Sequence, residues 1–203
     1  ISAVPVTSVV MTDAIPVAPP PVPPNPIDFV LSYVAGSATL NGTSGGVSVG
    51  EADYTKAMMR KLAGASGGVA FWRIAMRPGR PMMHGRLGDM HVLGLPGNPA
   101  SAYVCAFLFL LPLLRKLGGR IDIAHPTEAA LLGSDLPEND ERADYLRARM
   151  SRSLRGQLVA TPFPLQDSSL TRVLAEADCL VVREPHAVKA LAGSPCVILK
   201  LPF

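Results

Sequence analysis

Apolar positions recur with two different periods in the middle of the chain. In YTKAMMRKLAG (Tyr54 to Gly64), Met58, Met59 and Leu62 lie among basic residues and the segment ends at a glycine, which predicts an amphipathic helix. GVAFWRIAM (Gly68 to Met76) instead alternates apolar and polar residues near its end, which predicts a strand. Helices and strands therefore follow one another in this region.

Further along, the pattern predicts a turn, a hairpin and a second helix. RPGRP (Arg77 to Pro81) contains the Pro-Gly dipeptide typical of turns, and two short strands follow it, Met82 to Gly85 and Met90 to Leu95. In NPASAYVCAFLFLLPLLRKLGG, Asn98 is a favourable N-cap and Pro99 suits the first helical position. Strands that alternate with helices in this way predict an α/β layer.

The segments on either side differ in composition. The first contains PVAPPPVPPNP, which cannot form a helix or a central strand because proline lacks a backbone donor. After a connector with prolines and charges at 120–141, the chain shows short strand patterns and one short helix, SLTRVLAEA. We predict three parts: 1–42 as a proline-rich arm or incomplete N-terminal part, 43–125 as the α/β domain, and 126–203 as a small, mainly β module.

Composition limits the class of protein. The chain has 203 residues, of which 48% are apolar and 17% charged, and its net charge is +3, so we expect a real core and no dedicated nucleic-acid binding. Cys105, Cys179 and Cys196 are predicted to be buried free thiols in a reducing cytosol. We find no signal peptide, and the uncharged part of Ala102 to Gly119 contains Pro112 and falls short of the roughly 20 residues that span a bilayer. We expect a cytoplasmic protein with no membrane contact.

The loop TSGGVSVG and the acids after it are a first candidate site. Its small residues (Gly45, Gly46, Ser48 and Gly50) let backbone N–H groups approach an anion at the start of a helix, although a tight turn without ligand explains them equally well. Glu51 and Asp53 follow. These two carboxylates either bind a hard cation such as Mg²⁺ or only stabilise the N-terminus of the following helix.

Two further loops carry groups that suit an anion. In FWRIAMRPGRP the guanidinium groups of Arg73, Arg77 and Arg80 fit phosphate or another oxyanion, and the alternative is a solvated basic edge. GLPGNPASA joins a strand to a helix and is either a purely structural turn or a second anion pocket; its candidate residues are Pro96, Gly97, Asn98 and Ser101.

Three such loops at successive strand ends would open on the same edge of the sheet, where open α/β folds bind ligands. The residues alone therefore predict a site for an anionic, phosphorylated small molecule. They do not predict a site for nucleic acid. His84 and His91 are possible acid–base groups, but we expect half-exposed histidines of the hairpin.

Taken in order, GGVSVGEADYTK, FWRIAMRPGRP, HG and GLPGNPASA resemble the molybdopterin molybdenumtransferase family, the MoeA and gephyrin E-domain type, over Thr43 to Gly119. The tail, RADYLRARM followed by LVATPFPLQDSSLTRVLAEADCLVVRE, looks like the C-terminal β-barrel of that family. The resemblance implies an α/β fold with a three-layer MogA-like domain, a mainly parallel sheet and a small C-terminal barrel.

The same resemblance implies insertion of molybdate into adenylylated molybdopterin, with Mg²⁺-assisted hydrolysis of the adenylate. Asp53 matches a metal or substrate contact, with Glu51 as its neighbour, and Arg73 and Arg77 match the cations that hold molybdate or phosphate. Further substrate contacts are implied, by position, at Ser101, Arg142, Arg147, Ser168 and Ser169. A homodimer is implied, as is hand-off of the substrate from a molybdopterin adenylyltransferase.

The chain also departs from the family. It has no GDEL stretch and no MDGYA-like stretch, and residues 1–42 do not match. Three alternatives therefore stay open: a non-catalytic scaffold that holds a peptide, an inactive domain with structural loops, and the related adenylyltransferase. The tail after Arg142 argues against the last, because that enzyme lacks the combination of PGRP and barrel.

Overall fold

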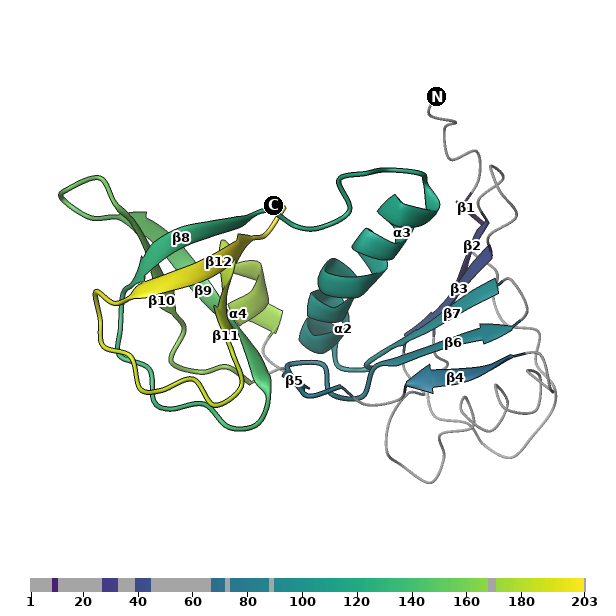
Figure 1. Cartoon of the computed structure of the whole chain (residues 1–203), viewed down its shortest axis with the longest axis horizontal. Coiled ribbons are helices and arrows are strands. Elements are labelled where there is room, and N and C mark those ends of the chain that lie inside the picture. Colours follow the sequence, from purple (N-terminus) through teal and green to yellow (C-terminus); the bar gives the residue numbers. More distant parts are fainter. Residues whose placement is uncertain are drawn as a thin grey trace. The chain divides into compact units, whose positions relative to one another are not determined.

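The computed structural model describes residues 9–10, 27–32, 39–44, 67–71, 74–87, 90–167 and 171–202. They form two compact units, one comprising 1–74 and 79–123 and the other 75–78 and 124–203 (Figure 1). The division into three parts drawn from the sequence stays a prediction. The predicted helix over 54–64 and the proline-rich segment lie outside the described residues.

The first unit contains a six-stranded sheet in the order β1-β2-β3-β7-β6-β4. One pairing, β3 with β7, is parallel, and the other four between neighbouring described strands are antiparallel. The expectation of a mainly parallel sheet is therefore wrong for these strands, and the three-layer arrangement stays a prediction. The strands are Val9–Val10 (β1), Ile27–Ser32 (β2), Thr39–Ser44 (β3), Gly67–Phe71 (β4), Met83–Leu87 (β6) and Met90–Leu95 (β7).

The hairpin that the sequence predicts is β6 and β7. Its turn between Leu87 and Met90 leaves room for two residues only, and such a short connection requires antiparallel partners because a parallel pair needs a crossover of a dozen residues or more. Leu93 and Leu95 of β7 are buried together with Met82 and Cys105. This side of the sheet thus carries the core of the first unit.

A continuous helical run covers that core. It comprises Pro99–Cys105 (α2), a π-helical segment at Ala106–Leu110 (η1) and Leu111–Leu117 (α3). Asn98 is the N-cap and Pro99 begins the helix, as predicted. The π segment directly precedes the turn that contains Pro112, where proline removes a hydrogen bond from the regular ladder.

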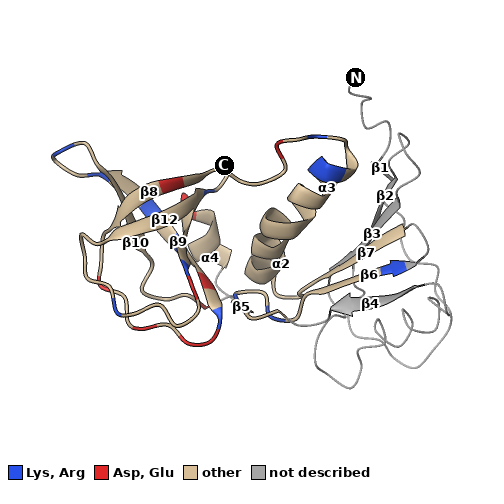
Figure 2. Ribbon diagram, in the orientation of Figure 1, with Lys and Arg blue, Asp and Glu red and all other residues tan. Residues whose placement is uncertain are grey.

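The apolar residues of this run form a stripe at helical spacing that packs against the buried residues of β7. This packing agrees with the expectation of a core helix. The members of the stripe are Ala102, Ala106, Phe109, Leu110, Leu113, Leu114 and Leu117. By length and composition alone Pro99–Leu117 is also the one helix, in the described part of the chain, that could cross a membrane. Figure 2 shows α2 without charged residues and a basic pair at the end of α3.

The second unit is a closed barrel of five strands in the order β10-β8-β12-β11-β9, because β9 also pairs with β10. This confirms the expected C-terminal β-barrel. Only β10 and β8 run parallel among these five. The strands are Thr127–Leu132 (β8), Ala143–Arg152 (β9), Leu158–Pro162 (β10), Cys179–Arg183 (β11) and Pro195–Lys200 (β12), and Thr171–Ala175 forms the short helix α4.

Small side chains fill the barrel. Its buried core contains Ala130, Ala148, Ala160 and Cys179 beside larger aliphatic residues such as Ile198. A barrel of few strands has a narrow interior, so small residues are needed where facing walls approach each other. The thiols of Cys105 and Cys179 are free and buried, as predicted, and burial raises the pKa of each to about 12.

Two strands were not predicted correctly. β8 lies inside the stretch 120–141 that was interpreted as a connector. Its TEAALL pattern is half exposed and contains a single β-branched residue, Thr127, so it gives a weak strand signal. The predicted strand over Gly68–Met76 is divided: β4 ends at Phe71, and Met76–Arg77 forms β5, which pairs in parallel with β9. Arg77 therefore belongs to a strand of the second unit and not to a turn.

We expect Gly133→Ala to destabilise the barrel by about 1–3 kcal/mol, because an added Cβ would lie 1.9 Å from Oγ1 of Thr161. The measurement is the free energy of unfolding in urea. The double variant Gly133→Ala/Thr161→Ala should lose less than the sum of the two single changes, since the closest clash is then removed. Wild-type stability of Gly133→Ala would contradict the close packing.

Candidate functional site

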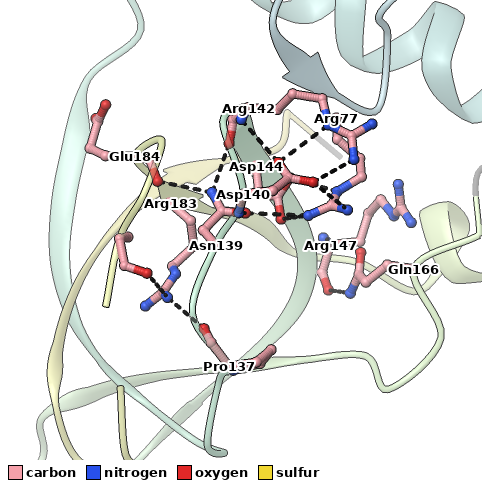
Figure 3. A network of polar contacts seen from close by, with 11 residues as sticks. Arg77, Pro137, Asn139, Asp140, Arg142, Asp144, Arg147, Gln166, Arg183 and Glu184 are labelled. Atoms are coloured by element: carbon pink, nitrogen blue, oxygen red, sulfur yellow. Dashed lines mark hydrogen bonds and ion pairs between the residues drawn. The ribbon is translucent and has the colours of Figure 1, made fainter. Parts of the chain in front are cut away.

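A network of polar side chains lies where β5 meets β9 in the second unit. Arg77 donates from Nε to Oδ1 of Asp144 at 2.7 Å and from Nη2 to Oδ2 of Asp144 at 2.5 Å (Figure 3). Nη1 of Arg77 lies 3.5 Å from Oδ2 of Asp140. Asp144 is 6% exposed, and the hydrogen bonding that Arg77 donates to its carboxylate is the main cause that raises the pKa of Arg77.

Asp140 has a second cationic partner in Arg142. Nη2 of Arg142 donates to Oδ2 of Asp140 at 2.5 Å, and the backbone N–H of Arg142 donates to Oδ1 at 2.9 Å. These bonds lower the pKa of Asp140 to about 2, with the side-chain bond from Arg142 as the largest cause. Two arginines and two aspartates thus form an ion-pair network rather than a set of uncompensated cations.

Asn139 and Arg183 fix the loop around this network. Asn139 donates from Nδ2 to the carbonyl oxygens of Arg142 and Glu184, and its Oδ1 accepts from Nη2 of Arg77 at 3.3 Å. Arg183 donates from Nη2 to three backbone carbonyls, those of Pro137, Ala187 and Val188. Each side chain holds loop segments that are far apart in sequence.

A cavity of about 780 Å³ opens beside the network within the same unit. Its polar lining includes Arg77, Asn139, Asp144, Gln166 and Arg183, and its apolar lining includes Leu136, Leu146, Pro162, Phe163 and Pro164. The polar groups of Asn139, Asp144 and Gln166 make internal hydrogen bonds. The cavity therefore has a largely prearranged wall.

Arg147 differs from Arg77 and Arg142 in its hydrogen bonding. It is 1% exposed, and its Nε and Nη2 have no hydrogen-bond partner among the residues that the structure describes. Burial lowers the pKa of Arg147, and the charges of Asp167 and Asp144 act in the opposite direction. A buried guanidinium with two unused donors is unusual, since buried polar groups are nearly always paired.

Gln166 holds the backbone of Arg147 on both sides. Its Oε1 accepts from the N–H of Arg147 at 3.0 Å, and its Nε2 donates to the carbonyl of Arg147 at 2.9 Å and to that of Phe163 at 2.8 Å (Figure 3). The side-chain amide of Gln166 thus makes the kind of hydrogen bonds with the backbone of β9 that a neighbouring strand would make. The segment after β10 is thereby fixed against the strand that carries Arg147.

The candidates of the strand-to-helix turn lie in the first unit. Asn98 Oδ1 accepts from the N–H of Ser101 at 3.4 Å, which is the capping bond of α2, and Ser101 is 5% exposed. Pro96 is buried, Gly97 is exposed, and Arg80 is exposed with its carbonyl accepting from Ile74. The capping bond fits the structural interpretation of this turn, and the anion pocket stays a prediction.

The other candidates lie outside the described residues. They are Gly45, Gly46, Ser48, Gly50, Glu51, Asp53, Arg73, Ser168 and Ser169. Within the described ranges, no group of three or more His, Cys, Asp or Glu side chains is placed to hold a metal ion. The assignment of Mg²⁺ to Glu51 and Asp53 stays a prediction.

The structure adds residues that the sequence did not single out. Asp144, Asp140 and Asn139 hold Arg77 and Arg142, and Gln166 holds Arg147. Gln166 stands first in the QDSS stretch, so that motif did contain a signal. Asp144 lies 67 positions after Arg77, and no local pattern indicates such a pairing.

The fold and these motifs define a protein with a molybdopterin-binding type of domain followed by a MoeA-type barrel. Residues 40–116 match the model of a probable molybdopterin binding domain, and residues 129–201 match that of the MoeA C-terminal region, domain IV. The chain belongs to the MoeA-type molybdopterin molybdenumtransferase family, which confirms the resemblance seen in the sequence.

Individual relatives support this assignment. The molybdopterin molybdenumtransferase of Haemophilus influenzae is 35% identical over 179 residues, which cover 87% of this chain and 43% of the relative. That of Bacillus subtilis is 35% identical over 140 residues, or 69% of this chain and 32% of the relative. The crystal structure of the molybdopterin biosynthesis MoeA protein from Pyrococcus horikoshii matches with a TM-score of 0.58 and 26% identity, over 73% of this chain and 35% of that one. The chain spans less than half the length of these relatives.

We expect the ion-pair network to make the stability of the barrel depend on acid pH. The pKa of Asp140 is about 2 in the folded protein and near 4 in an unfolded chain, so its contribution is complete above about pH 4 and is lost as the pH falls towards 2. Asp140→Asn should therefore lower the urea midpoint at pH 6, and the difference from the wild type should become much smaller as the pH falls to 2. Glu141→Gln, a change of the same charge at an exposed neighbour, is the control; an equal effect of both variants at pH 6 would contradict a specific role.

Proposed function

We propose that this chain provides the part of a molybdenum insertion enzyme that binds molybdate and the phosphate of its pterin substrate. The reaction is insertion of molybdate into adenylylated molybdopterin, accompanied by hydrolysis of the adenylate. The single observation that carries the proposal is the buried guanidinium of Arg147, whose Nε and Nη2 have no hydrogen-bond partner in the part of the chain that the structure describes. Family membership supports the choice of substrate.

The two unused donors of Arg147 form one edge of its guanidinium group. Nε–H and one N–H of Nη2 point in parallel from that edge, and two oxygens of a tetrahedral oxyanion fit such a pair. Molybdate and phosphate both present this pair of oxygens. Arg77 lacks such an edge, because its Nε and Nη2 already donate to Asp144.

Keeping such a cation has an energetic cost. A buried guanidinium with unsatisfied donors destabilises a fold, and its replacement by an apolar side chain of similar volume often increases stability. An incoming oxyanion would supply the missing charge and acceptors in a site of low dielectric, where charge-assisted hydrogen bonds are strong. We infer that the cost is retained because the ligand offsets it.

The surrounding structure would orient the ligand. Gln166 fixes the backbone on both sides of Arg147, so the guanidinium starts from a rigid strand. Ser168 and Ser169 follow Gln166 in the chain and could add hydroxyl donors. Holding an oxyanion at a fixed place in this way lowers the barrier through proximity and through electrostatic stabilisation of developing charge.

Arg73, Arg77 and Arg142 remain predicted as further substrate contacts. For Arg77 and Arg142 the aspartates would have to be displaced, at least in part, before either guanidinium could bind an oxyanion. We therefore assign the first oxyanion contact to Arg147. Arg77→Ala would also leave the buried carboxylate of Asp144 without its partner, so loss of function in that variant would be ambiguous.

Mg²⁺ would be held by Glu51 and Asp53, since carboxylate oxygens are the ligands that this ion prefers. When bound, the ion supplies charge neutralisation at the phosphoanhydride. We further propose that the protein acts as a cytoplasmic homodimer and receives its pterin substrate from a molybdopterin adenylyltransferase. The MoeA C-terminal match at 129–201 supports insertion over adenylylation as the activity.

We expect Arg147→Met to weaken binding of molybdate by roughly tenfold or more, because two charge-assisted hydrogen bonds are lost. At the same time the free energy of unfolding should stay equal or rise, since a buried guanidinium with unsatisfied donors is removed. Calorimetric titration with molybdate and urea denaturation measure the two effects. The molybdate affinity of Arg147→Lys should lie between those of the wild type and Arg147→Met, because lysine retains the charge but lacks the forked pair of donors.

Arg149→Met is the matched control. Arg149 lies two residues further along the same strand and the same face, but its side chain is 58% exposed and paired with Glu176. This change should leave molybdate binding unaltered. A stable Arg147→Met protein that binds molybdate like the wild type would refute the proposal, and a large loss of stability would show that Arg147 has a structural role instead.

We expect Asp53→Asn to remove the Mg²⁺ dependence of molybdate binding, because an amide is a poorer ligand for a hard dication than a carboxylate. Titration with molybdate in the presence and absence of Mg²⁺ measures this. Asp122→Asn, at an exposed carboxylate paired with Arg120, is the control. An Asp53→Asn protein with unchanged Mg²⁺ dependence would exclude Asp53 as a ligand.

A further inference from the structure

Two histidines of the β6–β7 hairpin face each other in the first unit. Nε2 of His84 lies 3.2 Å from Nδ1 of His91, and the ring centroids are 5.5 Å apart. In the register of the hairpin, His91 lies opposite Arg86, and His84 lies two residues before Arg86 on β6. The two histidines are thus diagonal neighbours on one face of the strand pair, each half-buried.

The distance between the two nitrogens is close to the distance between two nitrogen ligands of the same metal ion. Zinc binds imidazole nitrogen at about 2.0–2.1 Å, so two such ligands at a tetrahedral angle are about 3.3 Å apart. The observed 3.2 Å therefore needs a reorientation of the rings but almost no separation of the strands. Without a metal, a hydrogen bond joins the two rings: one imidazole N–H donates to the nitrogen of the other ring.

We propose that His84 and His91 form a binding site for a transition-metal dication of the zinc, copper or nickel type. Imidazole ligands suit these ions, whereas Mg²⁺ prefers oxygen ligands. The site therefore differs in ligand type from the carboxylate site proposed above, and it does not depend on the proposed function. In the part of the chain that the structure describes, no third His, Cys, Asp or Glu lies beside the pair.

The charge of Arg86 acts on both histidines of the pair. Burial lowers the pKa of both imidazoles, and the charge of Arg86 lowers each further. Arg86 also repels an incoming cation, so the site should be moderate in affinity, and removal of that charge should strengthen it.

The test is calorimetric titration of the full chain with Zn²⁺ at pH 7.5, in the presence of excess Mg²⁺. We expect one site in the wild type, roughly tenfold or greater weakening in His84→Gln and in His91→Gln, and tighter binding in Arg86→Gln. His125→Gln and His186→Gln, at the other histidines of the chain, should bind like the wild type. Cys196→Ser should do the same, which separates the pair from the half-buried thiol.

A second measurement needs no variant. Addition of Zn²⁺ should shift the NMR signals of two histidine rings and leave those of the other two in place. Absence of Zn²⁺ binding, binding that survives both His84→Gln and His91→Gln, or signals that shift at His125 or His186 instead would each overturn the proposal. The pair would then be a hydrogen-bonded contact between two strands and nothing more.

Discussion

The ion pair between Arg77 and Asp144 connects a two-residue strand to the barrel across 67 positions of sequence. Asp144 is almost completely buried, and a buried carboxylate is stable only when a cation and hydrogen bonds compensate it. Arg77 supplies both through two short hydrogen bonds. Residues 75–78 belong to the second unit, where β5 pairs with β9, and the loop that carries Asn139, Asp140 and Arg142 is arranged around the same guanidinium.

Strand β9 divides its side chains between two environments. Leu146, Ala148 and Met150 point into the barrel core, and the residues between them point outward, as the twofold period of a strand requires. Arg147 is on the outward side and yet almost fully buried, whereas Arg149 on that side is exposed and paired. Two arginines of the same motif thus differ completely in solvation, and the buried one has two donor atoms without a partner among the described residues.

The sequence predicted several local features of this fold. Alternation and short turns indicated the β6–β7 hairpin, and Asn98 followed by Pro99 indicated the start of α2, because capping and backbone dihedral angles depend on neighbours in sequence. Short strand patterns after the connector at 120–141 indicated the rest of the barrel. β8 was missed because its polar, exposed half hides the strand pattern, and β5 was missed because two residues carry no periodic signal.

For the candidate site, the sequence by itself determined which residue types are present and which family they indicate. The resemblance implied that Arg77 holds molybdate or phosphate and that Arg142 and Arg147 are further substrate contacts, but no sequence pattern indicated which of the three is paired with an acid. Only the tertiary structure decided that Asp144 and Asp140 neutralise the first two, and that Arg147 is buried with an unused edge. The physical reason is that charge compensation and desolvation depend on side chains brought together from distant segments, whereas the identity of a motif is written in consecutive residues.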